Sequence, residues 1–288
     1  MNNLANSLES RSKSIKDLDA AVKAIEEAIA IIPEDHPERS RLIGTRATVF
    51  HTRCEWSGSL ADLNTAIESN EEALGLTSVN HPERIRYLCN LALALRHRFQ
   101  VTGSVKDVNA AVVLLKEGLE LVPSDHPLRL KVLNNLGTIL ETRYDHIGSL
   151  DDLSAAIHAK QTALDTMTRD DAGRGDCLGN LSHSLHKRFK RTRLINDLLT
   201  AVSMNAEALT STPLDHPRLT LRLNNYGLTL QAWFLYTGSV EDLTTAVEIH
   251  KQAVTLTPPD QFSDLAIRFH SLAIALHTRF LWTGSVAT

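Results

Sequence analysis

Residues 103–147, GSVKDVNAAVVLLKEGLELVPSDHPLRLKVLNNLGTILETRYDHI, contain the pattern that decides the fold, because it returns along the whole chain. Gly-Ser or a variant of it begins at Lys13, Gly58, Gly103, Gly148, Arg193, Gly238 and Gly284, in steps of 45 residues and a last step of 46. A corner of the type Asp-His-Pro recurs with the same 45-residue period at Asp35, Asn80, Asp125, Asp170, Asp215 and Asp260. Two markers with a common period predict a repeat array.

The period assigns all of residues 1–288 to one array. We expect a partial repeat at 1–12, six 45-residue units from about 13 to 283, and a truncated unit at 284–288. Because the pattern starts and stops inside repeats, we expect about 13 helices and a chain that is a segment of a longer array.

Each unit contains two predicted helices. The first begins at Gly-Ser, where Ser149 is a natural N-cap and Asp152 completes a capping box. This Asp recurs in all six units, and an Ala always follows four residues later, where only a small side chain would let a neighbouring helix approach. The helix is expected to end near Pro33, Pro123, Pro213 or Pro258.

The second helix is predicted to begin at Asp-His-Pro, with Asp as the cap and Pro in the first turn, and to stop after Arg143-Tyr144. Its apolar residues follow the 3.6-residue period, as in Leu133, Leu136 and Leu140. A small residue always follows the second of these, again for close helix crossing. The arginine before the terminal aromatic is expected to pair with the recurrent Asp of the next helix; these arginines are Arg53, Arg98, Arg143, Arg188 and Arg279.

Composition agrees with a helical protein, since 43% of the residues are hydrophobic but only 5% are aromatic. The net charge of -4 argues against nucleic acid as the partner, because phosphate binding needs a cationic face. Three cysteines far apart predict neither a disulfide framework nor a zinc site. With no signal peptide and no run of about 18 apolar residues, we expect a soluble, cytoplasmic protein without a membrane partner.

A helix with Leu133, then Asn135-Leu136-Gly137 and Leu140, next to a helix with Ala at the crossing point and a final Pro, resembles the tetratricopeptide repeat (TPR). The resemblance covers essentially the whole chain, although the usual unit has about 34 residues. The longer unit is similar to the TPR arrays of fungal proteins that often precede a CHAT domain, and more distantly to kinesin light chain repeats. No CHAT domain is found here. The resemblance implies an all-α, right-handed solenoid.

The same resemblance implies that the Asn-Leu-Gly helix lines a concave binding groove. One asparagine per unit would then form a ladder: Asn90, Asn135, Asn180 and Asn225. A carboxamide can donate to a peptide carbonyl and accept from a peptide amide, and in related arrays such a ladder binds peptide backbone. The alternative is that these residues only hydrogen-bond the neighbouring helix.

Selectivity would come from the residue four positions before each asparagine. These residues are Arg41, Arg86 and Lys131, followed by Asp176, Leu221 and Ile267, so the first half of the groove is expected to be cationic and the second apolar. Further candidates for the lining are Arg96, His97, His183, His186 and Lys187. Glutamates on the first helices should form an acidic outer side: Glu26, Glu27, Glu68, Glu71, Glu72, Glu117 and Glu120. This segregation predicts an acidic ligand, against the alternative of a merely solvated charged face.

Other histidines are expected to be structural. His36, His81, His126 and His216 each belong to their own corner. His183 and His186 are three residues apart on one helix, but two ligands are too few for a structural zinc site, so we predict no metal and no cofactor.

The sequence therefore favours a non-enzymatic protein-interaction scaffold that binds an extended peptide or partner segment. The alternative is a structural, self-associating array that stacks end to end, motivated by Trp282 and the unfinished last unit. An enzyme finds no support, since the chain has no phosphate loop, nucleophile elbow or His-Glu-x-x-His helix. RNA binding would need a groove that is basic along its length.

Overall fold

The computed structural model describes residues 2–171 and 173–284, and the side chains from residue 15 onward within these ranges. The described residues form twelve helices and no strand. Their bounds are α1 Asn2–Ile31, α2 Arg39–Ser57, α3 Leu60–Gly75, α4 Arg84–Thr102, α5 Val105–Leu121, α6 Leu128–Ile147, α7 Leu150–Asp165, α8 Arg174–Thr192, α9 Ile195–Thr210, α10 Leu219–Thr237, α11 Val240–Leu256 and α12 Phe262–Thr283. The all-α class predicted from the sequence is confirmed.

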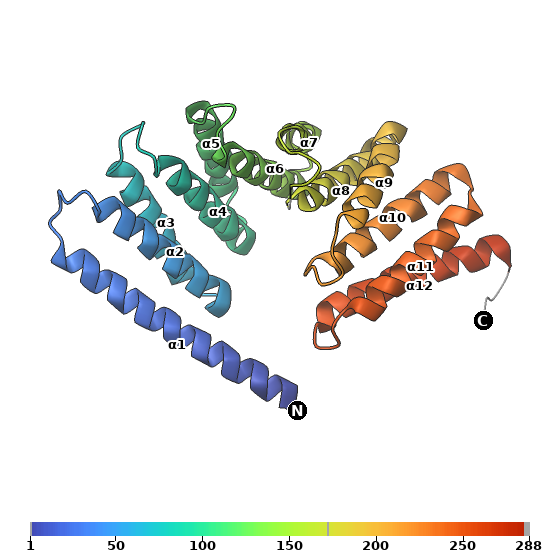
Figure 1. Cartoon of the computed structure of the whole chain (residues 1–288), viewed down its shortest axis with the longest axis horizontal. Coiled ribbons are helices and arrows are strands. Elements are labelled where there is room, and N and C mark those ends of the chain that lie inside the picture. The colour runs from blue at the N-terminus through green and yellow to red at the C-terminus, as the bar shows by residue number, and fades with distance from the viewer. Residues whose placement is uncertain (1, 172, 285–288) are drawn as a thin grey trace. The chain divides into compact units, whose positions relative to one another are not determined.

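The helices form two compact units, Met1–Asp152 and Leu153–Thr288, which divide within α7. In each unit, consecutive helices pack against one another as antiparallel neighbours (Figure 1). Odd-numbered helices are the predicted first helices of the repeats and even-numbered helices the second. The core lies between them and is rich in Leu and Ala, with Leu63, Ala66 and Tyr87 among the fully buried side chains.

The N-terminal helix differs from the expectation. Two helices were predicted on either side of residue 13, but α1 runs without a break from Asn2 to Ile31, so the described chain has twelve helices instead of thirteen. The side chains of the partial repeat 1–12 lie outside the described residues, as does the truncated unit 284–288 apart from Gly284. The division into repeats at these two ends remains a prediction.

Most Gly-Ser turns are built as predicted, but Ser104 forms no side-chain cap hydrogen bond. Gly58, Gly103, Gly148, Gly238 and Gly284 end their helices with positive φ, which glycine adopts without steric cost. Ser59, Ser149 and Ser239 then accept a hydrogen bond from the backbone N–H of the recurrent Asp three residues on. In the repeat that begins at Arg193, this arginine itself takes the left-handed conformation in place of glycine, with φ of 61°.

The Asp-His-Pro corner was predicted wrongly in one respect. The second helix starts three to four residues later than expected, at Arg39 in the first corner, and Asp35 is an exposed loop residue. The reason is a competing turn, in which Nδ1 of His36 accepts the backbone N–H of Glu38. The same bond forms at the other three Asp-His-Pro or Asn-His-Pro corners, at His81, His126 and His216. These histidines are therefore structural, as expected.

Four of the five predicted pairs between arginine and the recurrent Asp are confirmed, whereas Arg279 has no following helix among the described residues. Nε and Nη2 of Arg98 each lie 2.8 Å from a carboxylate oxygen of Asp107, a bidentate arrangement. The third nitrogen of Arg98 donates to Asn64 Oδ1 on the preceding first helix. The clamp therefore joins a second helix to the first helices on both sides. The bidentate pair is repeated in Arg53–Asp62, Arg143–Asp152 and Arg188–Asp197, and the bond to the preceding first helix in Arg53 and Arg143.

A second set of arginines was not anticipated. Nη1 of Arg84 donates to the carbonyl oxygens of Leu74 and Thr77, and so satisfies carbonyls that the end of α3 leaves without an intrahelical donor. Equivalent bonds are made by Arg39, Arg129 and Arg174. The signal was present in the sequence, since these arginines also recur every 45 residues.

Candidate binding surface

The even-numbered helices form the inner layer of each unit. In the described part of the chain α2 contacts α4, α4 contacts α6, α8 contacts α10, and α10 contacts α12, although each pair is separated in sequence by another helix. Helices that approach their counterparts in successive repeats lie on the more closely spaced side of a solenoid. The four predicted asparagines are all on these helices: Asn90 on α4, Asn135 on α6, Asn180 on α8 and Asn225 on α10.

Among the described residues, only the Cys89 thiol hydrogen-bonds one of these carboxamides, that of Asn135. Asn180 is exposed and the other three are half-buried. None of the four side chains forms a hydrogen bond to an oxygen or nitrogen of another described residue, and Nδ2 of Asn135 is buried without a partner among them. Asn135 on α6 is thus bonded to the neighbouring helix α4, as the structural interpretation predicts, whereas Asn90, Asn180 and Asn225 form no such side-chain bond among the described residues. These side chains therefore retain hydrogen-bond donors and acceptors that are not used within the described protein.

The predicted cationic residues of the first unit are partly neutralised. Arg41 pairs with Glu38 and Arg86 with Glu83, each the N-cap residue of the arginine's own helix. The guanidinium of Arg86 also lies over the ring of Tyr87. Lys131 is exposed and forms no ion pair with a described residue. The cationic stripe is therefore weaker than the sequence alone indicates, because the glutamates share its face.

Arg96 and His97 lie in a small polar cluster between α2 and α4. Nδ1 of His97 is 3.3 Å from Nε2 of His51, and their rings are tilted against each other. Nε of Arg96 is buried without a partner among the described residues, and burial lowers the pKa of this guanidinium. Burial also lowers the pKa of His51, while the charge of Glu55 opposes that shift. Arg96 and His97 follow Asn90 by six and seven residues on α4, and their role as lining residues remains a prediction.

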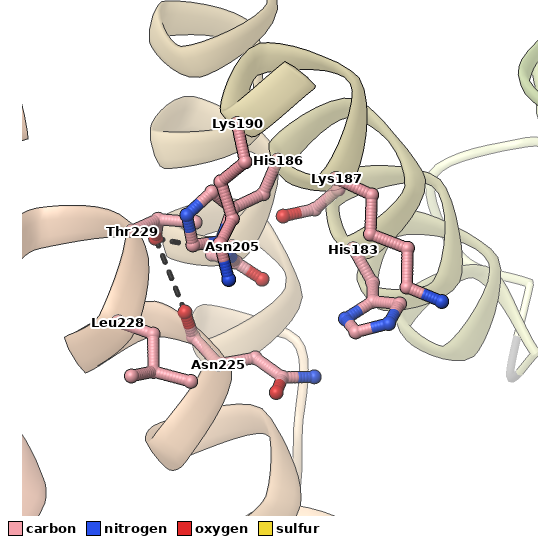
Figure 2. A pocket seen from close by; sticks show the side chains of 9 residues that line it. His183, His186, Lys187, Lys190, Asn205, Asn225, Leu228 and Thr229 are labelled. Atoms are coloured by element: carbon pink, nitrogen blue, oxygen red, sulfur yellow. Dashed lines mark hydrogen bonds between the residues drawn. The ribbon is translucent and has the colours of Figure 1, made fainter. Parts of the chain in front are cut away.

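The second unit contains a small polar cavity of about 100 Å³ between α8 and α10. Four predicted residues line it: His183, His186 and Lys187 from α8 and Asn225 from α10. In Figure 2, Lys190 and His186 lie above the cavity, Asn225 lies below it, and Asn205 of α9 reaches in from behind. The Nδ2 of Asn205 donates to Thr229 Oγ1 at 3.1 Å. The cavity therefore combines ammonium, imidazole and carboxamide groups.

His186 is neutral at physiological pH. Burial, followed by the nearby positive charge of Lys190 and by His183, lowers its pKa to about 4. A neutral imidazole can accept one hydrogen bond and donate another. His186 therefore adds no positive charge to this cavity at neutral pH.

An apolar cavity of about 390 Å³ adjoins the polar one and shares His186 and Lys190 with it. Its other lining residues come from the ends of α8 and α10: Phe189, Arg193, Ala232, Leu235 and Tyr236. The guanidinium of Arg193 lies 5.7 Å from the centre of the Phe189 ring. The sequence analysis missed Lys190 and Arg193. The available signal was that α8 has two basic residues in its last turn, Lys190 and Arg191.

The second half of the surface is thus not simply apolar. Asp176 is half-buried and bound to Arg222 of α10 at 2.6 Å, whereas Leu221 and Ile267 are exposed apolar side chains. The glutamates expected on the outer side lie on α1, α3 and α5, and all but the half-buried Glu117 are exposed. Two of them serve the fold, because Glu72 pairs with Arg46 and Glu117 with Arg84.

Neither a metal site nor a membrane-spanning helix is found among the described residues. No group of three His, Cys, Asp or Glu side chains is arranged to hold a metal ion. No helix in this part of the chain combines the length and apolarity that crossing a bilayer requires.

Solved structures with the same arrangement of helices are TPR proteins. YrrB, described as a TPR protein with an unusual peptide-binding site, matches with a TM-score of 0.51 and 16% identity over 87% of this chain and 98% of its own. A putative kinesin light chain of Podosopora anserina with nearly identical TPR-like repeats matches with a TM-score of 0.56 and 18% identity, covering 78% and 98%. BtubC (BKLC) from P. vanneervenii matches with a TM-score of 0.55 and 14% identity, covering 96% and 94%.

The chain has a TPR-like solenoid fold. The identities are too low to carry more than the fold, and neither a protein-family model nor a curated protein sequence matches the chain. The relation to fungal CHAT-associated arrays remains a prediction from the sequence.

Proposed function

We propose that the chain is a non-enzymatic, cytoplasmic protein-interaction scaffold that binds an extended peptide or partner segment along the inner layer of its helices. The observation that carries this proposal is the set of four carboxamides, one per repeat, of which only that of Asn135 forms a side-chain hydrogen bond within the described protein, to the Cys89 thiol. Each can satisfy one peptide unit as both donor and acceptor. Recognition of backbone in this way is independent of the ligand's side chains.

We propose further that the ligand is acidic. Lys190 and Arg193 give the cavities between α8 and α10 a cationic rim, and Lys131 is an exposed cation on α6. Ammonium and guanidinium groups form charge-assisted hydrogen bonds with carboxylates. The apolar wall at Leu235 and Tyr236 would receive a bulky side chain of the same ligand.

A second function is favoured by a different observation. The last helix, α12, exposes large apolar side chains, among them Phe269, Phe280 and Trp282. A contiguous apolar face of this kind marks an interaction surface. A structural array whose copies associate end to end would cover it.

The test of the scaffold function is substitution of Asn90, Asn135, Asn180 and Asn225 by Ala. Peptides selected from a random library on the wild-type protein supply the probe, and fluorescence anisotropy measures their affinity. We expect the fourfold variant to bind at least tenfold more weakly, with an unchanged helical circular dichroism spectrum and melting curve, because each lost hydrogen bond contributes about 1 kcal/mol.

Matched control variants are Asn80→Ala and Asn196→Ala, which remove exposed asparagines outside the inner layer. They should bind the peptides as the wild type does. Equal binding by the fourfold variant, or its unfolding, would show that the asparagines are not ligand-binding residues.

A further inference from the structure

The arginine–aspartate clamp is found at the junctions where one repeat packs against the next. In each of four junctions the arginine near the end of a second helix binds the Asp in the first turn of the following first helix. The Asp is nearly buried at every junction, and the guanidinium is between a fifth and a third exposed. The clamp therefore accompanies the burial of the apolar faces on both helices.

One arginine and one aspartate of this series are left over. Arg279 on α12 occupies the arginine position, but the described chain has no first helix after it. Asp17 on α1 occupies the aspartate position and is exposed. Neither forms an ion pair with a residue whose side chain the structure describes. They are the two halves of one more clamp.

The apolar face of α12 is the face that a following first helix would cover. Phe269, Leu276 and Phe280 are 52%, 37% and 47% exposed. The residues at the same repeat positions of α10, whose face α11 covers, are Leu223, Leu230 and Phe234, with exposures of 4%, 3% and 0%. The described residues include no helix that packs on this face of α12 as α11 packs on α10.

The face of α1 shows the complementary difference. Leu18, Ala21 and Ala28 are half-buried, whereas the residues at the same positions of α3, which packs against both α2 and α4, are Leu63, Ala66 and Ala73 and are fully buried. The small alanines leave room for the side chains of an approaching helix. Acidic Asp17 lies at the end of this face, as Asp62 does in α3.

We propose that α12 of one copy docks on α1 of a second copy, and that Arg279 of the first forms the clamp with Asp17 of the second. The docking reproduces the junction that the chain builds four times internally, with matching apolar faces and opposite charges. The two faces differ, so the contact is head to tail and can continue from copy to copy. This inference rests on the second of the proposed functions and is independent of peptide binding.

The test is a charge exchange, read by light scattering after size exclusion over protein concentrations from micromolar to near-millimolar. The wild type should exceed the monomer mass of 31.8 kDa increasingly with concentration. Arg279→Asp alone and Asp17→Arg alone should each associate at least tenfold more weakly, because like charges then meet at the junction. A mixture of the two variants should assemble again, and so should the double variant alone.

Arg169→Asp is the matched control, since it reverses an exposed arginine in the loop between α7 and α8 and should assemble as the wild type does. Circular dichroism checks that each variant is folded. A wild type that stays monomeric throughout would overturn both the docking and the self-associating function. Assembly that survives each single substitution, or that is not restored by the exchange, would overturn the docking alone and assign the covering of α12 to another segment or partner.

Discussion

At the scale of single residues, the guanidinium of Arg98 connects three helices. It binds Asp107 on α5 with two nitrogens and Asn64 on α3 with the third. Asp107 is only 7% exposed, so its carboxylate depends on this partner. Loss of one member of such a pair is more costly than the net contribution of the pair, because a charge remains in a poorly solvated place.

We therefore predict that Arg98→Ala lowers the free energy of unfolding by about 2–3 kcal/mol. Urea denaturation followed by circular dichroism measures it. Arg191→Ala is the control, since Arg191 is exposed and forms no ion pair with a described residue, and it should change stability by less than about 0.5 kcal/mol. Equal effects of the two substitutions would contradict the clamp.

A second residue makes stability depend on pH. His250 on α11 is fully buried, its Nε2 lies 3.3 Å from Gln231 Oε1, and burial lowers its pKa to about 4. Its ordinary pKa is 6.5. Between these two values the unfolded chain binds a proton that the folded chain does not, so stability falls as the pH decreases through this range.

The expected decrease from this group is about 2 kcal/mol between about pH 7 and about pH 5. His250→Leu, which installs the residue found at the same repeat position in α5 as Leu115, should reduce the slope by that amount, even if its stability at pH 7 differs. Urea titrations at both pH values measure it. An unchanged slope would show that His250 does not remain neutral in the fold.

At the scale of helices and turns, the glycine that ends each second helix is required for its backbone conformation. Gly148 has φ of 80°, and no atom lies within 4 Å of where its Cβ would be. Ala at this position is therefore strained by the backbone alone. Gly75, at the end of α3, has equally open surroundings but no positive φ.

We predict that Gly148→Ala destabilises the protein by about 1 kcal/mol, whereas Gly75→Ala is neutral or stabilising by up to about 1 kcal/mol. Thermal unfolding distinguishes the two. A similar shift in Tm for both variants would show that the left-handed turn is not what matters.

The helix pairs could be predicted from the sequence because the period repeats the same local signals. Recurrence of Asp107 and Arg98 at fixed spacing was sufficient to predict their pairing. The start of each second helix was not predicted correctly, because Nδ1 of the corner histidine captures a backbone N–H, as His36 does, and delays the helix. Such a competition between two local hydrogen bonds leaves no trace in hydrophobic periodicity.

The residues of the candidate site were harder to predict from the sequence, for a related reason. Repeat positions identified Asn225, His183 and Lys187, but the contribution of Lys190 depends on how the end of α8 faces α10. The neutralisation of Arg41 by Glu38 also depends on side-chain direction along one helix. A periodic sequence predicts which residues share a layer, and not which of them are already paired.

At the scale of the whole molecule, the net charge of -4 does not describe the proposed binding surface. The proposed ligand would meet Lys190 and Arg193 locally, and charges beyond about one Debye length, about 8 Å at physiological salt, contribute little. Recognition of an acidic peptide should therefore depend on local cations and weaken as salt increases.

We predict that Lys190→Glu weakens binding of a selected acidic peptide by about tenfold, equivalent to about 1.4 kcal/mol. The control Arg169→Glu changes the net charge equally from an exposed loop and should bind as the wild type does. Fluorescence anisotropy at low and high salt measures both. Equal weakening by the two variants would indicate a general charge effect instead of a site.

The central claim is that the asparagines of the inner layer bind a ligand directly. The most direct measurement is an NMR titration that follows the side-chain NH₂ resonances of the protein labelled with ¹⁵N-asparagine while a selected peptide is added. We predict shifts at Asn90, Asn135, Asn180 and Asn225, assigned by single substitution, with none at Asn80 and Asn196. Saturated binding without shifts at the four ladder resonances would contradict the claim.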